Sequence, residues 1–111
     1  MDTRHATSDL DIGSGNIFAD LGLKDADTLM TRTALGIQVI KTIRKKGLRQ
    51  KEAGTLLRLK QPDVSAIMRA KFSRFSQERL IRFLNKLDQK VTIHMSRRHR
   101  GQPYQQVMAA R

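Results

Sequence analysis

The sequence has no cysteine, and no apolar run approaches the roughly 18 residues that cross a membrane as a helix. The absence of cysteine excludes disulfides, thiol catalysis and cysteine-ligated zinc. The first residues carry no apolar stretch of the kind that directs secretion, so we expect a soluble cytoplasmic protein with no membrane partner. Alternating apolar and polar residues, the signal of a strand, are almost absent. The 111 residues therefore predict one domain of the all-α class.

Acidic residues are scarce: 10 Asp and Glu stand against 22 Lys and Arg, a net charge of +12. The imbalance is uneven along the chain. Residues 1–30 hold six carboxylates and two cations, a net −4, whereas residues 31–111 hold 20 cations and four carboxylates, a net +16. Such an excess attracts polyanions, so nucleic acid or an acidic surface is the first partner to consider. The acidic first part suggests a second surface with a different partner.

Residues 1–15 are polar and contain Gly13, Ser14 and Gly15, which predicts a disordered acidic leader. Helical periodicity dominates residues 16–88, which we interpret as one helical domain. Gly47 follows a run of cations and marks a helix end, Pro62 suits the first turn of a helix, and Ser76 is a good N-cap. Five helices are expected, over residues 16–22, 26–46, 48–57, 61–69 and 77–88.

Residues 91–95 change period and alternate apolar and polar side chains, as a strand does. A lone strand cannot satisfy its backbone groups, and no other segment of the chain resembles one. We therefore expect residues 89–96 to pair with a second copy of the chain, through Val91, Ile93 and Met95, and so to form a homodimer. Residues 97–111 are predicted to be a basic, flexible tail.

The two short helices expected over residues 48–57 and 61–69 are joined by three residues, which matches the layout of a helix-turn-helix motif. Because that motif binds DNA, we interpret residues 16–88 as one helix-turn-helix DNA-binding domain. The second helix of that motif is held by its apolar face, here Val64, Ile67 and Met68, while the other face enters the major groove of DNA. Glutamine pairs well with adenine, arginine with guanine, and small apolar groups touch the thymine methyl. The expected base-reading residues are Gln61, Pro62, Ser65, Ala66 and Arg69. The expected phosphate contacts are Gln50, Lys60, Lys71 and Arg74.

Residues 48–54, together with Ser65, Ala66, Ile67 and Lys71, resemble the lambda-repressor-like (XRE/Cro-type) helix-turn-helix family. The pattern of that family is L-T-Q-x-x-L-A, then a G-V-S-Q turn, then x-x-(V/I)-S-x-(I/L). Residues 18–23, 75–80 and 91–93 extend the similarity, over residues 17–95, to the HigA-type branch of antitoxins and small regulators. The resemblance implies a homodimer on a palindromic double-stranded DNA operator in the gene's own promoter. It also implies a toxin partner of RelE/HigB type.

The sequence departs from the family pattern at four positions. Arg49 replaces the threonine that usually caps the first motif helix, so its cap must be weaker or come from elsewhere. Gly54 replaces a common alanine and keeps the residue small where the two helices cross. Arg58 and Ala70 replace common glycines, and at Arg58 this predicts a non-glycine residue near the left-handed region.

Other classes of protein share some of these sequence features. A free-standing XRE-type regulator without a toxin would share the same DNA mechanism, and the neighbouring gene distinguishes the two. A basic RNA-binding structural protein would fit the charge but lacks an aromatic sheet or glycine-rich clamp. His5, His94 and His99 have no metal-ligand spacing, and no nucleophile–base arrangement is evident, so we expect no metal, no cofactor and no enzymatic activity. If there is a toxin, the acidic leader and the first long helix are its expected contacts.

Overall fold

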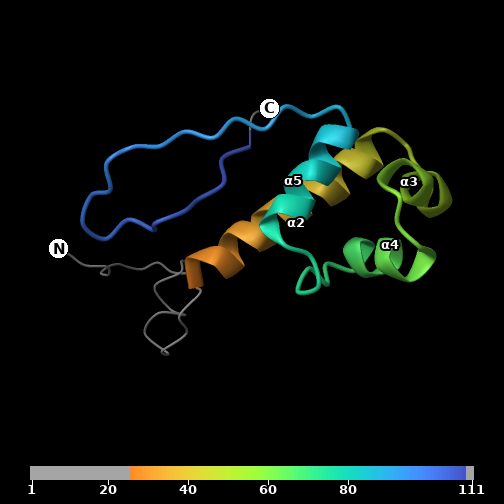
Figure 1. Ribbon diagram of the computed structural model, residues 1–111, viewed down its shortest axis with the longest axis horizontal. Helices are drawn as coiled ribbons and strands as arrows, with labels where there is room; N and C mark the ends of the chain where they lie inside the picture. The colour runs from red at the N-terminus through yellow and green to blue at the C-terminus, as the bar shows by residue number, and fades with distance from the viewer. Residues whose placement is uncertain (1–25, 110–111) are drawn as a thin grey trace. The chain divides into compact units, whose positions relative to one another are not determined.

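The computed structural model describes residues 26–109, which hold four α-helices and no strand (Figure 1). The helices are α2 (Ala26–Lys45), α3 (Gln50–Leu57), α4 (Gln61–Met68) and α5 (Gln77–Lys86). The all-α expectation is confirmed over this range. The expected helix at 16–22 and the acidic leader lie outside the described residues.

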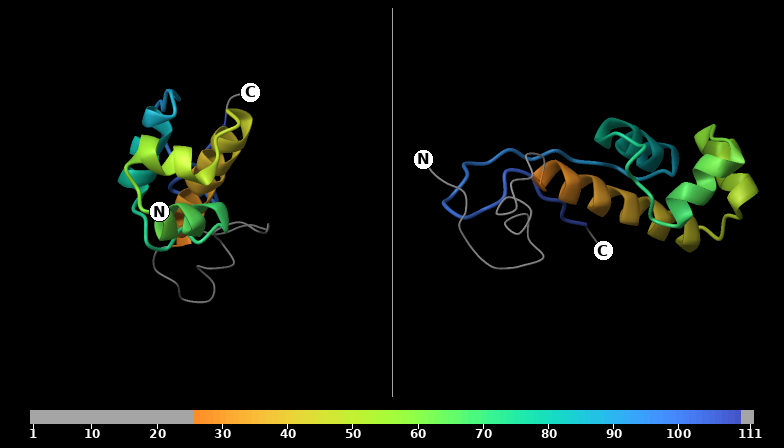
Figure 2. Two further views of the ribbon diagram at one scale, coloured as in Figure 1. Left: turned by 90° about the vertical axis from the view of Figure 1, so that its right-hand side faces the viewer. Right: turned by 90° about the horizontal axis from the view of Figure 1, so that it is seen from below.

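The chain divides into two compact units. The helical unit, residues 32–92, contains most of α2 and all of α3, α4 and α5. The terminal unit joins the first turn of α2 to the end of the chain, and its described residues are 26–31 and 93–109. Within the helical unit, α3 and α4 lie together beyond the C-terminal end of α2 (Figure 2).

The end of α2 follows from its sequence. Arg44 and Lys45 lie in its last turn, where cations stabilise the negative end of the helix dipole. Gly47 adopts a φ of +68°, and its N–H donates to the carbonyl of Arg44 while that of Leu48 donates to Ile43. This pair of bonds closes the helix in the way that glycine favours. The predicted end of the helix at residue 46 is therefore one residue beyond the observed end.

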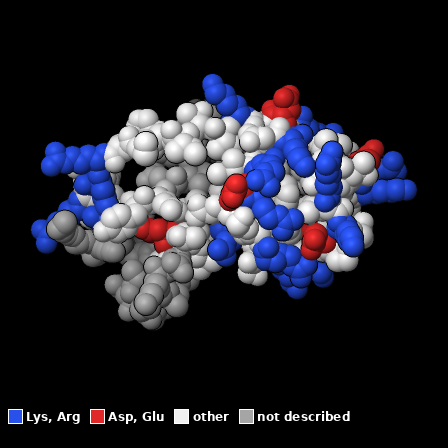
Figure 3. Space-filling view, viewed as in Figure 1, with Lys and Arg blue, Asp and Glu red and all other residues white. Residues whose placement is uncertain are grey.

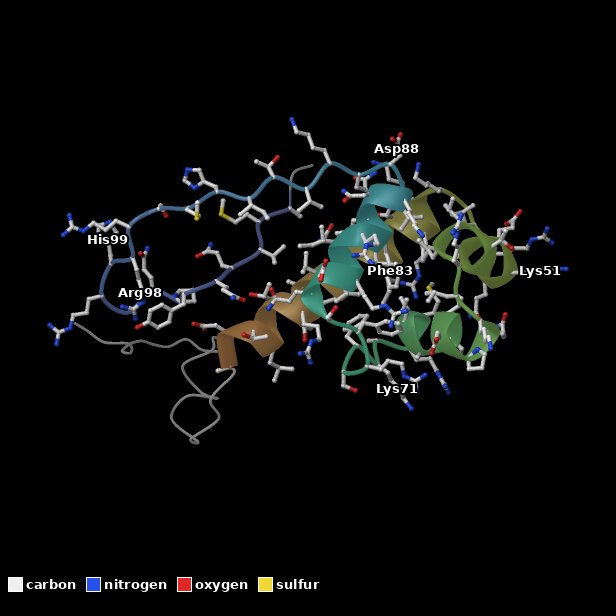
Figure 4. The ribbon with its side chains drawn as sticks, viewed as in Figure 1. Lys51, Lys71, Phe83, Asp88, Arg98 and His99 are labelled. Carbon is white, nitrogen blue, oxygen red and sulfur yellow. The ribbon has the colours of Figure 1, made fainter. Side chains whose placement is uncertain are left out.

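The core of the helical unit draws apolar side chains from each of its helices. The most completely buried are Val39, Ile43, Leu57, Val64, Ile67, Phe75, Leu80 and Leu87. The rings of Phe75 and Phe83 meet edge to face, with centroids 5.8 Å apart, and the guanidinium of Arg79 lies over both rings. Figure 4 shows Phe83 on the inner side of α5. Both phenylalanines are buried core residues.

The expectation of a strand at residues 91–95 is not met in the single chain. The segment is not paired with any other described segment, and Ile93 and Met95 are 76% and 89% exposed. The physical reason is that a strand needs a partner ladder, and alternation alone does not supply one. Before it, α5 ends at Lys86, with Asp88 at a φ of +66° and the Gln89 N–H donating to the Leu84 carbonyl.

Among the described residues, no helix is both long enough and apolar enough to cross a membrane.

Candidate nucleic-acid interface

The first motif helix, α3, begins without a side-chain cap from the residue before it. Arg49 takes the N-cap position, and an arginine side chain has no acceptor to offer. The Glu52 carboxylate instead accepts the Arg49 backbone N–H at 2.8 Å. That hydrogen bond, with the Arg49 charge beside it, lowers the pKa of Glu52. Glu52 therefore satisfies the N–H of Arg49, whereas no side chain at the N-cap accepts an N–H from the first turn of α3, which agrees with a cap weaker than that of threonine.

The turn between α3 and α4 consists of Arg58, Leu59 and Lys60, as the sequence predicts. Arg58 adopts φ 58° and ψ 47°, the left-handed conformation expected for a residue that replaces glycine. The Leu59 N–H then donates to the Gly54 carbonyl at 2.8 Å. A Cβ at Gly54 would lie 2.9 Å from the Leu59 carbonyl oxygen and 3.2 Å from Val64, so the helices cross closely at this small residue.

The second motif helix, α4, buries Val64, Ala66 and Ile67. The expectation that Ala66 lies on the exposed stripe is wrong, because its side chain is only 2% exposed. The inner face of α4 is rotated relative to the expectation: Ala66 lies inside it, and Met68, an expected anchor, is half-buried at its edge. The thymine-methyl contact expected of Ala66 is therefore not available on this surface.

The remaining stripe of α4 faces outward. Gln61, Pro62 and Arg69 are exposed, and Ser65 is half-buried beside them. Because one helical turn takes 3.6 residues, Gln61, Ser65 and Arg69 fall on nearly one line along the helix. The Lys60 side chain is exposed at the N-cap of α4. The structure thus brings four of the five expected base-reading residues to one surface.

A hydrogen bond joins the starts of the two motif helices. The Gln61 side-chain amide donates to the Gln50 side-chain carbonyl, Nε2 to Oε1, at 2.8 Å. Each glutamine is the first residue of its helix, and both are exposed. The bond uses one of two donors on Gln61, and a glutamine so held presents its other polar atoms in one orientation. Residues 11 apart give no periodic signal, so this pair could not be read from the sequence.

Arg74, an expected phosphate contact, is paired within the chain. Its Nη1 lies 2.7 Å from Oδ1 of Asp63, in the first turn of α4. The loop that carries it starts at Ala70, which has a φ of +61°, while the Lys71 N–H donates to the Ala66 carbonyl. The loop is thereby closed onto the end of α4. Lys71 itself is exposed and points away from the ribbon (Figure 4).

Basic side chains cover much of the visible face of the helical unit, with few acidic ones among them (Figure 3). Lys51 extends outward from α3 on this side (Figure 4). Among residues 26–109, no three acidic, histidine or cysteine side chains come together as metal ligands would. The polar groups that α3, α4 and the turn between them expose are mainly cations and amides.

Known proteins share this arrangement. The model of a family described as a helix-turn-helix domain matches residues 17–96. A solved structure described as an XRE-family transcriptional regulator is 32% identical, with a TM-score of 0.68, over 78% of this chain and 97% of that one. The chain belongs to the XRE-type helix-turn-helix family. No curated protein is significantly similar in sequence. In this XRE-type domain, α3 and α4 are the two helices of the motif.

Proposed function

We propose that this XRE-type protein is a sequence-specific DNA-binding transcriptional repressor that places α4 in the major groove. The observation that carries the proposal is the outward stripe of Gln61, Ser65 and Arg69 on the second helix of the motif, whose opposite face is buried. Arg69 would read guanine and Gln61, held by Gln50, would read adenine. Pro62 would touch an apolar base edge.

The phosphate contacts proposed for the same complex are Gln50, Lys60 and Lys71. Lys60 and Gln50 lie at helix N-termini, where backbone N–H groups also attract anions. Arg74 would reach a phosphate only by leaving Asp63, so we assign it a smaller share of the affinity. These contacts position the domain and carry no sequence information.

The test compares Arg69→Ala with Lys60→Ala on the promoter DNA of the gene and on random duplex, by fluorescence anisotropy over a range of salt. If Arg69 reads a base, its loss weakens specific binding by about 1–3 kcal/mol and leaves random DNA nearly unchanged. Lys60→Ala should weaken both DNAs alike and lower the salt slope by about one.

The matched control is Lys86→Ala, which removes an exposed cation from the last turn of α5. It should change neither the affinity for either DNA nor the salt slope. Equal losses on both DNAs for Arg69→Ala would contradict its reading role. A preference for RNA over promoter duplex at matched salt would overturn the DNA assignment altogether.

We further propose that two copies pair through residues 91–95. Two exposed apolar side chains on an extended segment, Ile93 and Met95, support this, because such a segment is stabilised by a second strand. Val91 would lie on the same face by alternation. A dimer would bind a palindromic operator, its recognition helices about 34 Å apart.

An antitoxin role is the second candidate, supported by the resemblance of residues 18–23, 75–80 and 91–93 to HigA-type antitoxins and by the net −4 of residues 1–30. The toxin would be a basic RelE-like protein that meets the acidic residues. Co-purification with the product of an adjacent small gene tests the role. Unchanged toxin affinity after deletion of residues 1–25 would remove the leader from the interface. Absence of any such gene would leave a free-standing regulator.

A further inference from the structure

A second basic cluster lies outside the helix-turn-helix motif. Asp88 is the last acidic residue of the sequence, and the 23 residues after it hold five Lys and Arg. Three of these cations, Arg97, Arg98 and Arg100, fall within four residues. None of these three cations lies in α3 or α4.

The backbone at this cluster is a closed turn. The Gln102 N–H donates to the His99 carbonyl at 3.1 Å, which defines a β-turn over residues 99–102. Gly101, the third residue of that turn, has a φ of +85°, as a type II turn requires. The Gln102 side-chain oxygen accepts the His99 N–H at 2.8 Å. We call residues 97–102 the arginine turn.

Arg98 holds the arginine turn to the rest of the terminal unit. Its Nε donates to the Gln102 carbonyl at 2.9 Å, and its guanidinium carbon lies 4.2 Å from the centre of the Tyr104 ring. The Tyr104 N–H in turn donates to Oδ2 of Asp27, in the first turn of α2, at 2.7 Å. Figure 4 labels Arg98 and His99 where this segment bends back on itself.

Two guanidinium groups are left at the surface of the turn. Arg97 and Arg100 are exposed, whereas Arg98 is half-buried. Asp27 is the one acidic residue among the described residues of the terminal unit, and it is half-buried and already accepts the Tyr104 N–H. Because the backbone of the turn is already fixed, binding by its arginines costs side-chain freedom but no backbone ordering, and the guanidinium fork matches phosphate oxygens.

We propose that the arginine turn is a second DNA contact, in which Arg97 and Arg100 bind phosphates of the duplex backbone and Arg98 is a positioning residue. The inference rests on the proposed function, since DNA is already the ligand of the same chain there. The contact would add affinity without sequence information, because phosphates are the same at every base pair. It therefore predicts a change in salt dependence and no change in specificity.

The test is the salt dependence of binding for the double variant Arg97→Ala/Arg100→Ala in the full chain. Two lost phosphate contacts lower the slope of log affinity against log salt by about 1.8, and at about 0.1 M salt they lower affinity by tenfold or more. The loss should be equal on promoter and random duplex. The control, Arg82→Ala/Lys86→Ala on α5, removes the same charge and should leave the slope within about half a unit of wild type.

A second variant tests whether the fixed backbone conformation of the arginine turn contributes to binding. Gly101→Ala keeps every charge but is strained at a φ of +85°, so it should weaken binding to both DNAs several-fold while retaining the slope. An unchanged affinity for Gly101→Ala, or an equal loss of slope in the α5 control, overturns the proposal. The proposal is also overturned if Arg97→Ala/Arg100→Ala keeps the wild-type salt slope while Arg69→Ala still loses specific binding. Loss of binding to phosphatidylserine vesicles in that case would assign the turn to a membrane surface. A wild-type chain that binds no duplex overturns the proposed function itself.

Discussion

Gly36 lies in α2 against the ring of Phe72, and its replacement tests how the α4–α5 loop is packed. A Cβ at Gly36 would lie 2.4 Å from two ring carbons of Phe72 and 2.6 Å from a third. Carbon atoms in contact lie about 3.5–4.0 Å apart, so the ring would have to move by more than about 1 Å. Phe72 is 5% exposed and is held among core residues, so it has little room to move.

The expected effect combines two opposing terms. Overpacking a filled site destabilises by about 1–3 kcal/mol, and a contact this short belongs at the upper end of that range. Alanine in a helix interior is favoured over glycine by about 1 kcal/mol. Gly36→Ala should therefore lower the free energy of unfolding by about 2 kcal/mol, which corresponds to a fall in Tm of about 8–16 °C for a domain of this size.

The assay is urea unfolding followed by circular dichroism, arranged as a double-mutant cycle with Phe72→Ala. Once the ring is gone, Gly36→Ala should stabilise the chain, because only the helix preference remains. The control is Gly47→Ala, where a Cβ meets nothing within 4 Å but the φ is +68°. This substitution should lower the free energy of unfolding by the same amount with or without the Phe72 ring. A wild-type or higher stability for Gly36→Ala would refute the packing argument, and so would an equal loss in both backgrounds.

Three further predictions concern the site and the dimer. Glu52→Ala should destabilise α3, whereas Glu52→Gln keeps an acceptor for the Arg49 N–H. Because the pKa of Glu52 is lowered in the folded chain, its contribution is present above the ordinary value of 4.5 and disappears as the pH falls through the lowered pKa. Unfolding of wild type and Glu52→Ala should therefore converge in acid; a gap that is constant with pH would contradict this. Ile93→Asp should yield monomers in analytical ultracentrifugation, and an intact dimer would move the interface elsewhere. Gly54→Ala should lower stability by about 1–2 kcal/mol through its contact with the Leu59 carbonyl, measured by thermal unfolding; an unchanged Tm would show that the turn relaxes freely.

The helices α2 to α5 could be predicted because local sequence signals mark where they begin or end. Gly47 ends α2, three residues separate α3 from α4, and Ser76 caps α5 through a bond from the Arg79 N–H. Each signal acts over fewer than five residues, so the residues that form the sequence pattern are the same residues that form the helix end. The left-handed Arg58 could likewise be inferred, because the family that the sequence resembles commonly has glycine at this position of the turn.

The face of α4 was predictable only in part. An eight-residue helix contains little more than two turns, so a few apolar residues fix the direction of its inner face loosely. Alanine is compatible with either environment, and Ala66 lies inside because of how the helix packs, which the pattern does not encode. The strand at 91–95 shows the same limit more strongly, since pairing depends on a partner and alternation only makes it possible.

The Asp63–Arg74 pair illustrates what charge counting misses at this surface. Arg74 looks like a phosphate contact because it is a cation just past the recognition helix, yet its guanidinium lies against the only carboxylate of α4. Both side chains are partly exposed, so the pair contributes little to stability and can open. Its main effect is electrostatic: without Arg74, Asp63 would repel phosphates beside the helix that carries the proposed reading residues. Arg74 therefore cancels a local negative charge, and the net +16 of residues 31–111 overstates the cations that can meet DNA.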